Sequence, residues 1–290
     1  MSAFGNGSLV PFGEMSTAVQ MGTIQAIVWL PYYDVGKDPA AALFCTVPFG
    51  FYNASQVMAW YYEYGGLDLA QNFYSNWNIH FNTFSASSGQ IFGQTRKPYY
   101  NLDELKGKIF RSSGIQAETL KEAGMEVVVL PGAELFTALE RGIIDVAEFV
   151  GPGWNWRAGF HEIAPYILTP GWHEPASMEV VLSNKDSYNE LPDDLKLLLD
   201  TSIAYVGQGM AAYMKKDDAE AWQKMKDYGC TFIRLPDSDL ATLEDAKQRV
   251  VDKYSASNAA FAEIIKSQQA CIKEQQELTA ELEDFSYTRP

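Results

Sequence analysis

Residues 101–150 read NLDELKGKIFRSSGIQAETLKEAGMEVVVLPGAELFTALERGIIDVAEFV, and this stretch decides the fold. Three apolar segments predict strands, at residues 108–113, 125–130 and 143–150. Between them lie two segments with helical character, closed by Gly124 and Gly142. Strand, helix, strand, helix, strand with short connections is typical of a parallel sheet in an α/β protein.

The sequence on either side predicts further elements of both kinds. Strands are expected at TIQAIVW (23–29), ALFCTVP (42–48), IHFNTFSAS (79–87), MEVVLSN (178–184) and CTFIRL (230–235). Helices are expected at 55–77 with a Gly-Gly interruption, at 191–228 in two segments with a break, and at 237–285. No repeat or low-complexity linker is visible, so two lobes would have to be interleaved along the chain.

Composition and charge narrow the class of partner. The chain has 290 residues, of which 47% are hydrophobic and 13% aromatic, as in a globular protein. Its formal net charge of -15 argues against nucleic acid or an anionic membrane as a partner. An anionic ligand would need a local positive charge to bind against this average field.

The cysteines and the N-terminal segment give little support for a thiolate metal site or an export signal. Cys45, Cys230 and Cys271 are far apart, form no CxxC pair and have no role that the sequence assigns. MSAFGNGSLVPFGEM lacks the charged start and apolar core of a signal peptide. We therefore expect either a cytoplasmic protein or a chain trimmed at its N-terminus.

Two charged residues fall at strand ends in the 101–150 region. Arg111 is followed by Ser112, Ser113 and Gly114, which lead into a helix N-terminus. A guanidinium beside free backbone N–H groups is a carboxylate- or phosphate-binding arrangement, although a surface ion pair would explain Arg111 equally well. Glu148 ends an otherwise apolar strand on the same predicted sheet edge, which favours a functional role.

The stretch TPGWHEPAS (169–177) places Trp172, His173 and Glu174 on a stiff, irregular loop. It is compatible with a ligand-shaping loop, a metal site, a catalytic dyad or a tight turn around a buried Trp. The chain has no GxGxxG, GxxxxGK[ST], GxSxG or HExxH motif that would choose between them.

Taken in order, NLDELKGKIFRSSG, LPGAELFTALERGIIDVAEFVGP and PGWHEP resemble the extracytoplasmic solute-binding proteins of TRAP transporters, the DctP type. VGKDPAAALFCTVPFG and LVPFGEMSTAVQMGTIQA fit the subgroup that binds 2-oxo acids or lactate with a metal cation. The resemblance covers nearly the whole chain.

This resemblance implies a two-lobed periplasmic-binding-protein fold with a ligand cleft, crossing strands and a long C-terminal helix. Lobe I would comprise residues 1–84 with part of 176–235, and lobe II residues 85–175 with part of 236–290. The family's first strand-helix unit and export signal have no counterpart here, so we expect an N-terminally incomplete lobe I and a periplasmic location.

The resemblance also implies roles for individual residues. Arg111 would bind the ligand carboxylate through two donors. The ligand would be lined by Tyr33, Gln90, Phe149, Trp172 and His173. Na⁺ or Ca²⁺ would be held by oxygen ligands, which suit hard cations. These ligands would be Gln90, Glu174 and a backbone carbonyl at His173 or Phe149, with Glu148 as the rival carboxylate.

One departure from the family pattern concerns the strand that ends at Glu148. Family members have Glu-Trp where this chain has Glu148-Phe149, so an indole N–H that a substrate would accept from is absent. No organic cofactor is implied.

The resulting hypothesis is a binding protein, not an enzyme. It would capture a pyruvate-like 2-oxo acid or lactate with a cation and deliver it to TRAP membrane subunits. A homodimer through the C-terminal helix is a further expectation. The alternatives are a larger carboxylate in the same role, or a metal-dependent lyase or hydrolase that uses Glu148 or Glu174 as a base.

Overall fold

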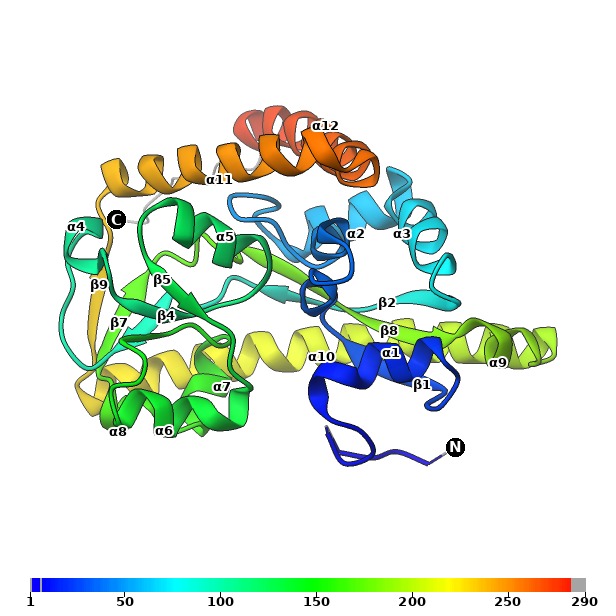
Figure 1. Ribbon diagram of the computed structural model, residues 1–290, viewed down its shortest axis with the longest axis horizontal. Helices are drawn as coiled ribbons and strands as arrows, with labels where there is room; N and C mark the ends of the chain where they lie inside the picture. Colours follow the sequence, from blue (N-terminus) through cyan, green and yellow to red (C-terminus); the bar gives the residue numbers. More distant parts are fainter. Residues whose placement is uncertain (1, 6, 283–290) are drawn as a thin grey trace.

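The structure is a computed structural model that describes residues 2–5 and 7–282, and its chain forms two β-sheets flanked by helices (Figure 1). The three-stranded sheet has the order β1-β8-β2, and the six-stranded sheet has the order β5-β4-β6-β3-β7-β9. The strands are β1 (Ala26–Trp29), β2 (Ile79–Ser88), β3 (Gly93–Thr95), β4 (Ile109–Arg111), β5 (Glu126–Val128), β6 (Val146–Ala147), β7 (Tyr166–Thr169), β8 (Ala176–Asn184) and β9 (Thr231–Arg234).

Short 3-10 helices (η) and α-helices connect and cover these strands. The 3-10 helices are η1 (Phe12–Glu14), η2 (Pro31–Asp34), η3 (Pro39–Phe44) and η4 (Gly132–Glu134). The α-helices are α1 (Met15–Gln20), α2 (Ala54–Glu63), α3 (Gly66–Ser75), α4 (Leu102–Leu105), α5 (Gly114–Glu122), α6 (Leu135–Glu140), α7 (Pro152–Arg157), α8 (Phe160–Ile163), α9 (Lys185–Asn189), α10 (Asp193–Tyr228), α11 (Asp237–Ser257) and α12 (Ala259–Leu282).

The three-stranded sheet is antiparallel and carries the largest apolar core. Its central strand β8 pairs with β1 on one side and with β2 on the other. The β2–β8 ladder runs from Ile79 opposite Asn184 to Ser88 opposite Ala176. The apolar faces of these strands pack with α2, α3 and η3, so the last residues of β2 and the first of β8 emerge together from a rigid core.

The six-stranded sheet contains the parallel unit predicted from residues 101–150. β4 pairs in parallel with both β5 and β6, which confirms that prediction. The sheet as a whole is mixed, because β3 pairs antiparallel with β6 and with β7. That pairing joins segments far apart in sequence, so the local pattern of residues 101–150 carries no trace of it.

Helices form layers on two sides of the molecule (Figure 1). On one side α11 packs on α5, and α12 packs on η3, α3 and α2. On the other side α10 crosses from α7 to β2. At 1.5 Å per residue, this helix is roughly 54 Å long. Among the described residues, no helix is both long enough and apolar enough to cross a membrane.

Two secondary-structure predictions are wrong. ALFCTVP does not form a strand, because the side chain of Asp38 accepts from the amide of Ala40 and Pro39 starts the 3-10 helix η3. The predicted break within 191–228 is absent, and α10 continues through Gly207, where a Cβ would lie 1.6 Å from the carbonyl oxygen of Phe84. The helical region predicted at 237–285 is divided at Asn258, whose backbone is extended, into α11 and α12. It is present to Leu282, and residues 283–285 lie outside the described part of the chain.

Candidate functional site

Arg111 and Glu148 meet at the carboxyl ends of two adjacent strands. β4 and β6 are parallel, with Arg111 opposite Ala147, so Glu148 follows directly on the same sheet edge as predicted. The guanidinium is 2% exposed, and its Nη1 lies 3.1 Å from Oε2 of Glu148. The alternative of a surface ion pair at Arg111 is therefore wrong.

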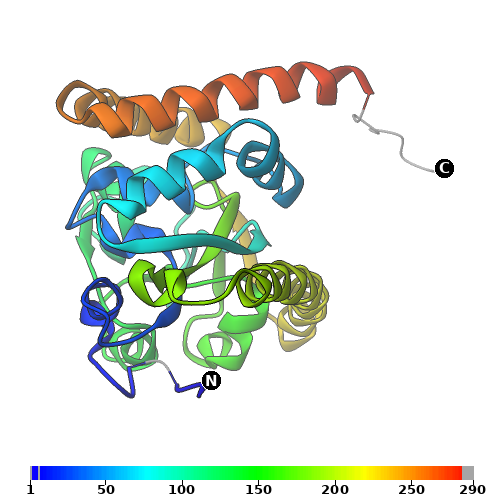
Figure 2. The same ribbon diagram turned by 90° about the vertical axis from the view of Figure 1, so that its right-hand side faces the viewer.

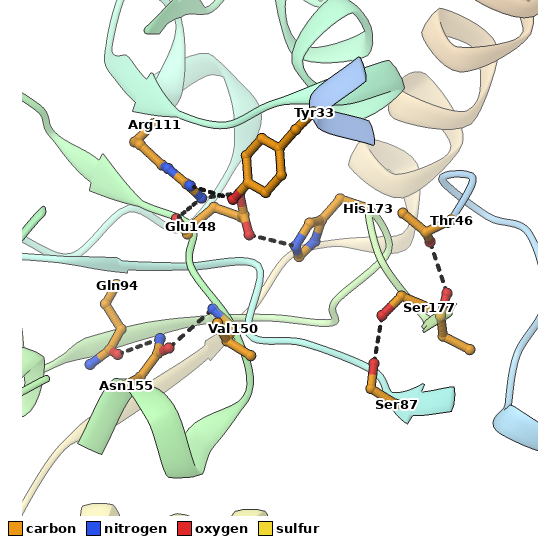
Figure 3. A network of polar contacts seen from close by, with 11 residues as sticks. Tyr33, Thr46, Ser87, Gln94, Arg111, Glu148, Val150, Asn155, His173 and Ser177 are labelled. Atoms are coloured by element: carbon orange, nitrogen blue, oxygen red, sulfur yellow. Dashed lines mark hydrogen bonds and ion pairs between the residues drawn. The ribbon is translucent and has the colours of Figure 1, made fainter. Parts of the chain in front are cut away.

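Tyr33 and His173 extend this pair from two other parts of the chain (Figure 3). The hydroxyl of Tyr33, on η2, lies 3.4 Å from Nη2 of Arg111. Nε2 of His173, in the loop between β7 and β8, lies 3.8 Å from Oε1 of Glu148. Four of the predicted site residues therefore form one chain of contacts.

Most donors of Arg111 are already used by the protein. Nε donates to the carbonyl of Leu130 at 3.1 Å, and Nη1 donates to both the carbonyl and the carboxylate of Glu148. Burial lowers the pKa of Arg111, but Glu148 and Tyr33 raise it by more, so the guanidinium stays charged. Only Nη2 is directed elsewhere, so a carboxylate that engaged both terminal nitrogens would have to displace Glu148.

Glu174 is the second carboxylate of the site and lacks a partner. It is fully buried, and no described residue forms a hydrogen bond of standard geometry with either carboxylate oxygen. Burial, followed by the charge of Glu148, raises the pKa of Glu174 to about 8, against smaller lowering by Ser177, Gln90 and Arg111. A buried acid of this kind is stable as an anion only when a cation or several donors face it.

Gln90 lies beside Glu174, as expected of two ligands of one ion. The amide N–H of Gln90 donates to the carbonyl of Glu174 at 3.1 Å. Its side-chain oxygen Oε1 is buried and has no hydrogen-bond partner in the described residues. The same is true of both ring nitrogens of His173. The side-chain oxygens of Gln90 and Glu174 therefore lie near one another, and each needs a positive partner.

The loop 169–177 forms a rigid wall beside these groups. The ring of Trp172 stacks on Phe49 and packs at a tilt on Phe92, with 5.3 Å between centroids in each case. The carbonyl of Trp172 accepts from the amide of Phe49, which has a positive φ of 54°. A Cβ at Gly171 would lie 2.0 Å from the carbonyl oxygen of Gln90, so this wall is a close contact of two backbones.

Phe149 is placed differently from the expectation for a ligand-facing side chain. Its ring packs on Phe160 and lies over Gly132, where a Cβ would be 2.7 Å from the ring. The side chain belongs to an apolar cluster around α6 and α8. No described residue donates to the backbone carbonyl of Phe149. This carbonyl, and not the ring, is therefore the group of Phe149 that could contribute to the site.

Near the start of α5 the sequence analysis named Ser112 and Ser113 without a role for their side chains, and it missed Gln116. Ser112, Ser113 and Gln116 are 0%, 4% and 1% exposed, and none of their side-chain polar atoms has a hydrogen-bond partner in the described structure. Gln116 Oε1 lies beside Gly114, whose φ is +63°. The signal in the sequence was Gln116 itself, a polar residue that directly follows Ile115 at the start of a buried helix.

Two hydrogen-bond networks hold the loops that carry the site (Figure 3). Asn155 on α7 donates to Gln94 Oε1 at 2.9 Å and accepts from the amide of Val150, which fixes the chain after Glu148. On the other side Thr46 donates to the carbonyl of Ala176, and Ser87 bonds to Ser177. These networks position the strand ends next to both carboxylates.

The arrangement suits binding of an anion with a cation better than transition-metal chemistry. Within residues 2–5 and 7–282, no three His, Cys, Asp or Glu side chains are grouped to hold a metal. A site made of one carboxylate, one amide oxygen and a backbone carbonyl is the kind that Na⁺ or Ca²⁺ takes. The unpartnered oxygens of Glu174 and Gln90 fit such an ion.

Comparisons with known proteins agree with this description. The family of bacterial extracellular solute-binding proteins, family 7 (DctP), matches residues 1–258. The monocarboxylate 2-oxoacid-binding periplasmic protein of Nostoc sp. is 30% identical over 274 residues, which are 94% of this chain and 75% of that protein.

Solved structures of TRAP transporter solute-binding proteins share the fold. One from Bordetella bronchiseptica, a dimer with calcium and picolinate, has a TM-score of 0.94 at 26% identity and covers 98% of this chain and 84% of its own. One from Pseudoalteromonas atlantica, with sodium and pyruvate, has a TM-score of 0.89 at 30% identity over 95% and 85%. The predicted family is confirmed: the chain belongs to the DctP family, family 7 of the bacterial extracellular solute-binding proteins.

Proposed function

We propose that this protein captures a small 2-oxo or 2-hydroxy monocarboxylate, such as pyruvate or lactate, together with Na⁺ or Ca²⁺. It would do so in the periplasm and deliver the ligand to TRAP membrane subunits. The family consists of transporter binding proteins and not of enzymes, so the lyase or hydrolase alternative is set aside. The observation that carries the proposal is the buried, unpartnered Glu174 beside the Arg111–Glu148 pair.

The charges of the site require a cation. Arg111 and Glu148 neutralise each other, and Glu174, whose pKa is raised to about 8, would ionise at neutral pH only beside a cation. Once ionised, Glu174 and the incoming carboxylate would be two negative charges in a buried space. Bringing two anions together in a medium of low dielectric is strongly unfavourable. A divalent cation would cancel both charges and a monovalent cation one of them, so ligand and cation should bind cooperatively.

Glu174 and Gln90 are the side chains that would hold this ion. No described residue donates to the backbone carbonyls of His173 and Phe149, whereas those of Trp172 and Glu174 are occupied. When bound, the cation would supply positive charge to the ligand oxygen next to the carboxylate. Nη2 of Arg111 would donate to the carboxylate itself, and its contact with Tyr33 would keep that donor in place.

The size of the ligand limits the affinity. At a ceiling of about 1.5 kcal/mol per heavy atom, a six-atom acid reaches roughly 9 kcal/mol, which corresponds to a sub-micromolar Kd at best. Trp172, which stacks on Phe49 and packs at a tilt on Phe92, would narrow one side of the space. This wall favours a short acid over the larger-carboxylate alternative.

We also propose the two-lobe division expected from the sequence, with residues 1–84 in lobe I and 85–175 in lobe II. The contact between Tyr33 and Arg111 supports a closed arrangement, because it would join the two lobes across the ligand. Closure would then be a hinge motion. The Bordetella bronchiseptica relative is a dimer, and we propose a homodimer here too.

Thermal unfolding with and without ligand tests the proposed function. Pyruvate, 2-oxobutyrate and lactate are added singly, each with Na⁺, with Ca²⁺ or with neither. At a hundred times Kd, a ligand contributes about 2.7 kcal/mol of stability, or roughly 4 °C in Tm. Glu174→Gln should remove the cation dependence, because the amide carries no charge.

The matched control is Glu179→Gln, which exchanges the same atoms on the central strand of the other sheet. It should keep both the ligand effect and the cation effect. If none of the three acids changes Tm with either cation present, the proposed ligand class is wrong. If Glu174→Gln binds acid with an unaltered cation dependence, Glu174 does not hold the ion.

A further inference from the structure

The start of α5 is a buried helix N-terminus with several unused donors. Its N-cap residue, Ser113, makes no side-chain hydrogen bond to the helix, and the hydroxyls of Ser112 and Ser113 are buried without a partner in the described structure. The amides of residues 113–116 likewise donate to no acceptor in the described part of the chain. A helix N-terminus with free N–H groups favours an anion, and burial strengthens that preference.

The side chain of Gln116 adds both a donor and an acceptor at the same place. It is buried, and neither Oε1 nor Nε2 has a hydrogen-bond partner among the described residues. Oε1 lies 3.2 Å from the position that a Cβ at Gly114 would take, so the amide folds back over the first residue of the helix. A buried amide without partners is unfavourable. This helix start therefore needs a polar partner that the described chain does not supply.

The 3-10 helix η2 connects this helix start to the rest of the site. A Cβ at Gly114 would lie 2.9 Å from Cβ of Tyr32, so η2 packs directly on the start of α5. The blue segment that carries η2 lies against the green segment that carries α5 (Figure 2). The next residue, Tyr33, lies 3.4 Å from Nη2 of Arg111. Burial raises the pKa of Tyr32, and Tyr33 and then Glu174 raise it further, so this tyrosine lies near both carboxylate-binding and cation-holding groups.

A ligand carboxylate needs more donors than Arg111 offers. Nε and Nη1 of Arg111 are occupied by Leu130 and Glu148, which leaves Nη2. A carboxylate has two oxygens, each of which accepts more than one hydrogen bond. The amides and serine hydroxyls at the start of α5 would supply the remaining donors. Held in this way, the carboxylate leaves the contact between Arg111 and Glu148 intact.

The acceptor Oε1 of Gln116 distinguishes two classes of acid. When the donors face the carboxylate, Oε1 still requires an O–H or N–H group. A 2-hydroxy acid has a hydroxyl on the carbon next to its carboxylate, whereas an ionised 2-oxo acid has only acceptors. A site that pairs with a ligand hydroxyl discriminates against the analogue that lacks it, because the group of the protein is then left buried and unpaired.

We propose that Gln116 selects 2-hydroxy monocarboxylates, such as lactate, over the corresponding 2-oxo acids. Its Oε1 accepts from the 2-hydroxyl and its Nε2 donates to the carboxylate, which Arg111 and the start of α5 hold in place. The hydroxyl of lactate lies on a chiral carbon, so a fixed carboxylate and a fixed hydroxyl also favour one enantiomer. This inference rests on the proposed function and specifies its substrate class.

Titration calorimetry with L-lactate, D-lactate and pyruvate, each in the presence of Ca²⁺, tests the inference. The wild type should bind the better lactate enantiomer about tenfold more tightly than pyruvate, as expected for one unpaired buried acceptor. Gln116→Leu should weaken lactate binding about ten times more than pyruvate binding, so the ratio of the two Kd values falls to about one. The ratio between the two enantiomers should fall as well. Gln116→Met, which keeps the length of the side chain, should give the same result and provides a second variant.

Two control variants lie on the same segment. Ser113→Ala should weaken lactate and pyruvate by the same factor, because a donor to the carboxylate contributes equally to both acids. Thr119→Val removes a hydroxyl that already donates to the carbonyl of Ile115 at 2.9 Å, and it should leave both affinities unchanged.

A wild type that binds pyruvate more tightly than either lactate would overturn the inference. So would Gln116→Leu and Gln116→Met variants that keep the wild-type ratio, while binding of both acids would leave the proposed function standing. A change of ratio in Ser113→Ala, but not in the Gln116 variants, would assign the hydroxyl contact to Ser113. If none of the three ligands binds to the wild type, the proposed function fails and this inference fails with it.

Discussion

Replacing Arg111 by methionine should destabilise the protein and abolish ligand binding. The change leaves the Glu148 carboxylate buried beside an apolar chain and removes the donors to the carbonyls of Leu130 and Glu148. Removing one partner of a buried ion pair costs about 3–5 kcal/mol. For a chain of this size, that is a fall of roughly 5–8 °C in Tm.

A double-mutant cycle separates the pair from other effects of the substitution. Glu148→Gln keeps the shape of the side chain but leaves the guanidinium without its counter-charge. Because Arg111→Met and Glu148→Gln each disrupt the same contact, the double variant should cost less than the sum of the single variants by about 2 kcal/mol or more. Unfolding in denaturant, with equal m-values for all four proteins, provides these free energies.

Ligand binding gives the second readout of the cycle. Arg111→Lys keeps a positive charge but cannot donate to Leu130, Glu148 and a ligand at once, so it should recover part of the stability and little of the affinity. Strictly additive costs, or an Arg111→Met protein that pyruvate stabilises as much as the wild type, would refute the reasoning.

Three further predictions concern residues around the site. Gln116→Leu should leave stability equal or higher, because it removes an unpaired buried amide, and should weaken pyruvate binding about tenfold by calorimetry; unchanged affinity would contradict a ligand contact. Asn155→Ala should cost about 2–3 kcal/mol in denaturant unfolding, since Gln94 and the amide of Val150 lose their partner; a cost near zero would mean that this network does not support the loop. Burial raises the pKa of Glu179 in the folded protein above its ordinary 4.5, so its destabilising effect is absent below that value and grows as pH rises through the folded pKa. Glu179→Gln should therefore raise Tm at about pH 8 and leave it unchanged at about pH 4, and an equal effect at both would contradict the linkage.

The unit at residues 101–150 was predictable because local interactions define it. Asn101 caps α4 by accepting from the amide of Glu104, and Gly124 and Gly142 take the positive φ that ends each helix. Parallel neighbours end on one edge, so the meeting of Arg111 and Glu148 followed from the same pattern.

The rest of the fold and of the site depends on contacts between segments that are distant in sequence. A local sequence pattern gives no information about such contacts. β3 inserts antiparallel between β6 and β7, and α10 stays continuous because Gly207 fits over Phe84. Phe149 turns into the cluster with Phe160 because Gly132 leaves room for its ring. The occupied donors of Arg111 depend on the position of Leu130, which only the folded chain brings near.

The contact between Gly171 and the backbone of Gln90 has a consequence for redesigning the specificity of this receptor. Two peptide groups touch at this point of the wall, so a larger residue at Gly171 would push the carbonyl of Gln90 by more than an ångström. Variation in ligand choice, in nature or in a biosensor, should therefore arise at Tyr33, Phe49 and Gln116. These positions can change size and polarity while the cation-holding oxygens keep their places.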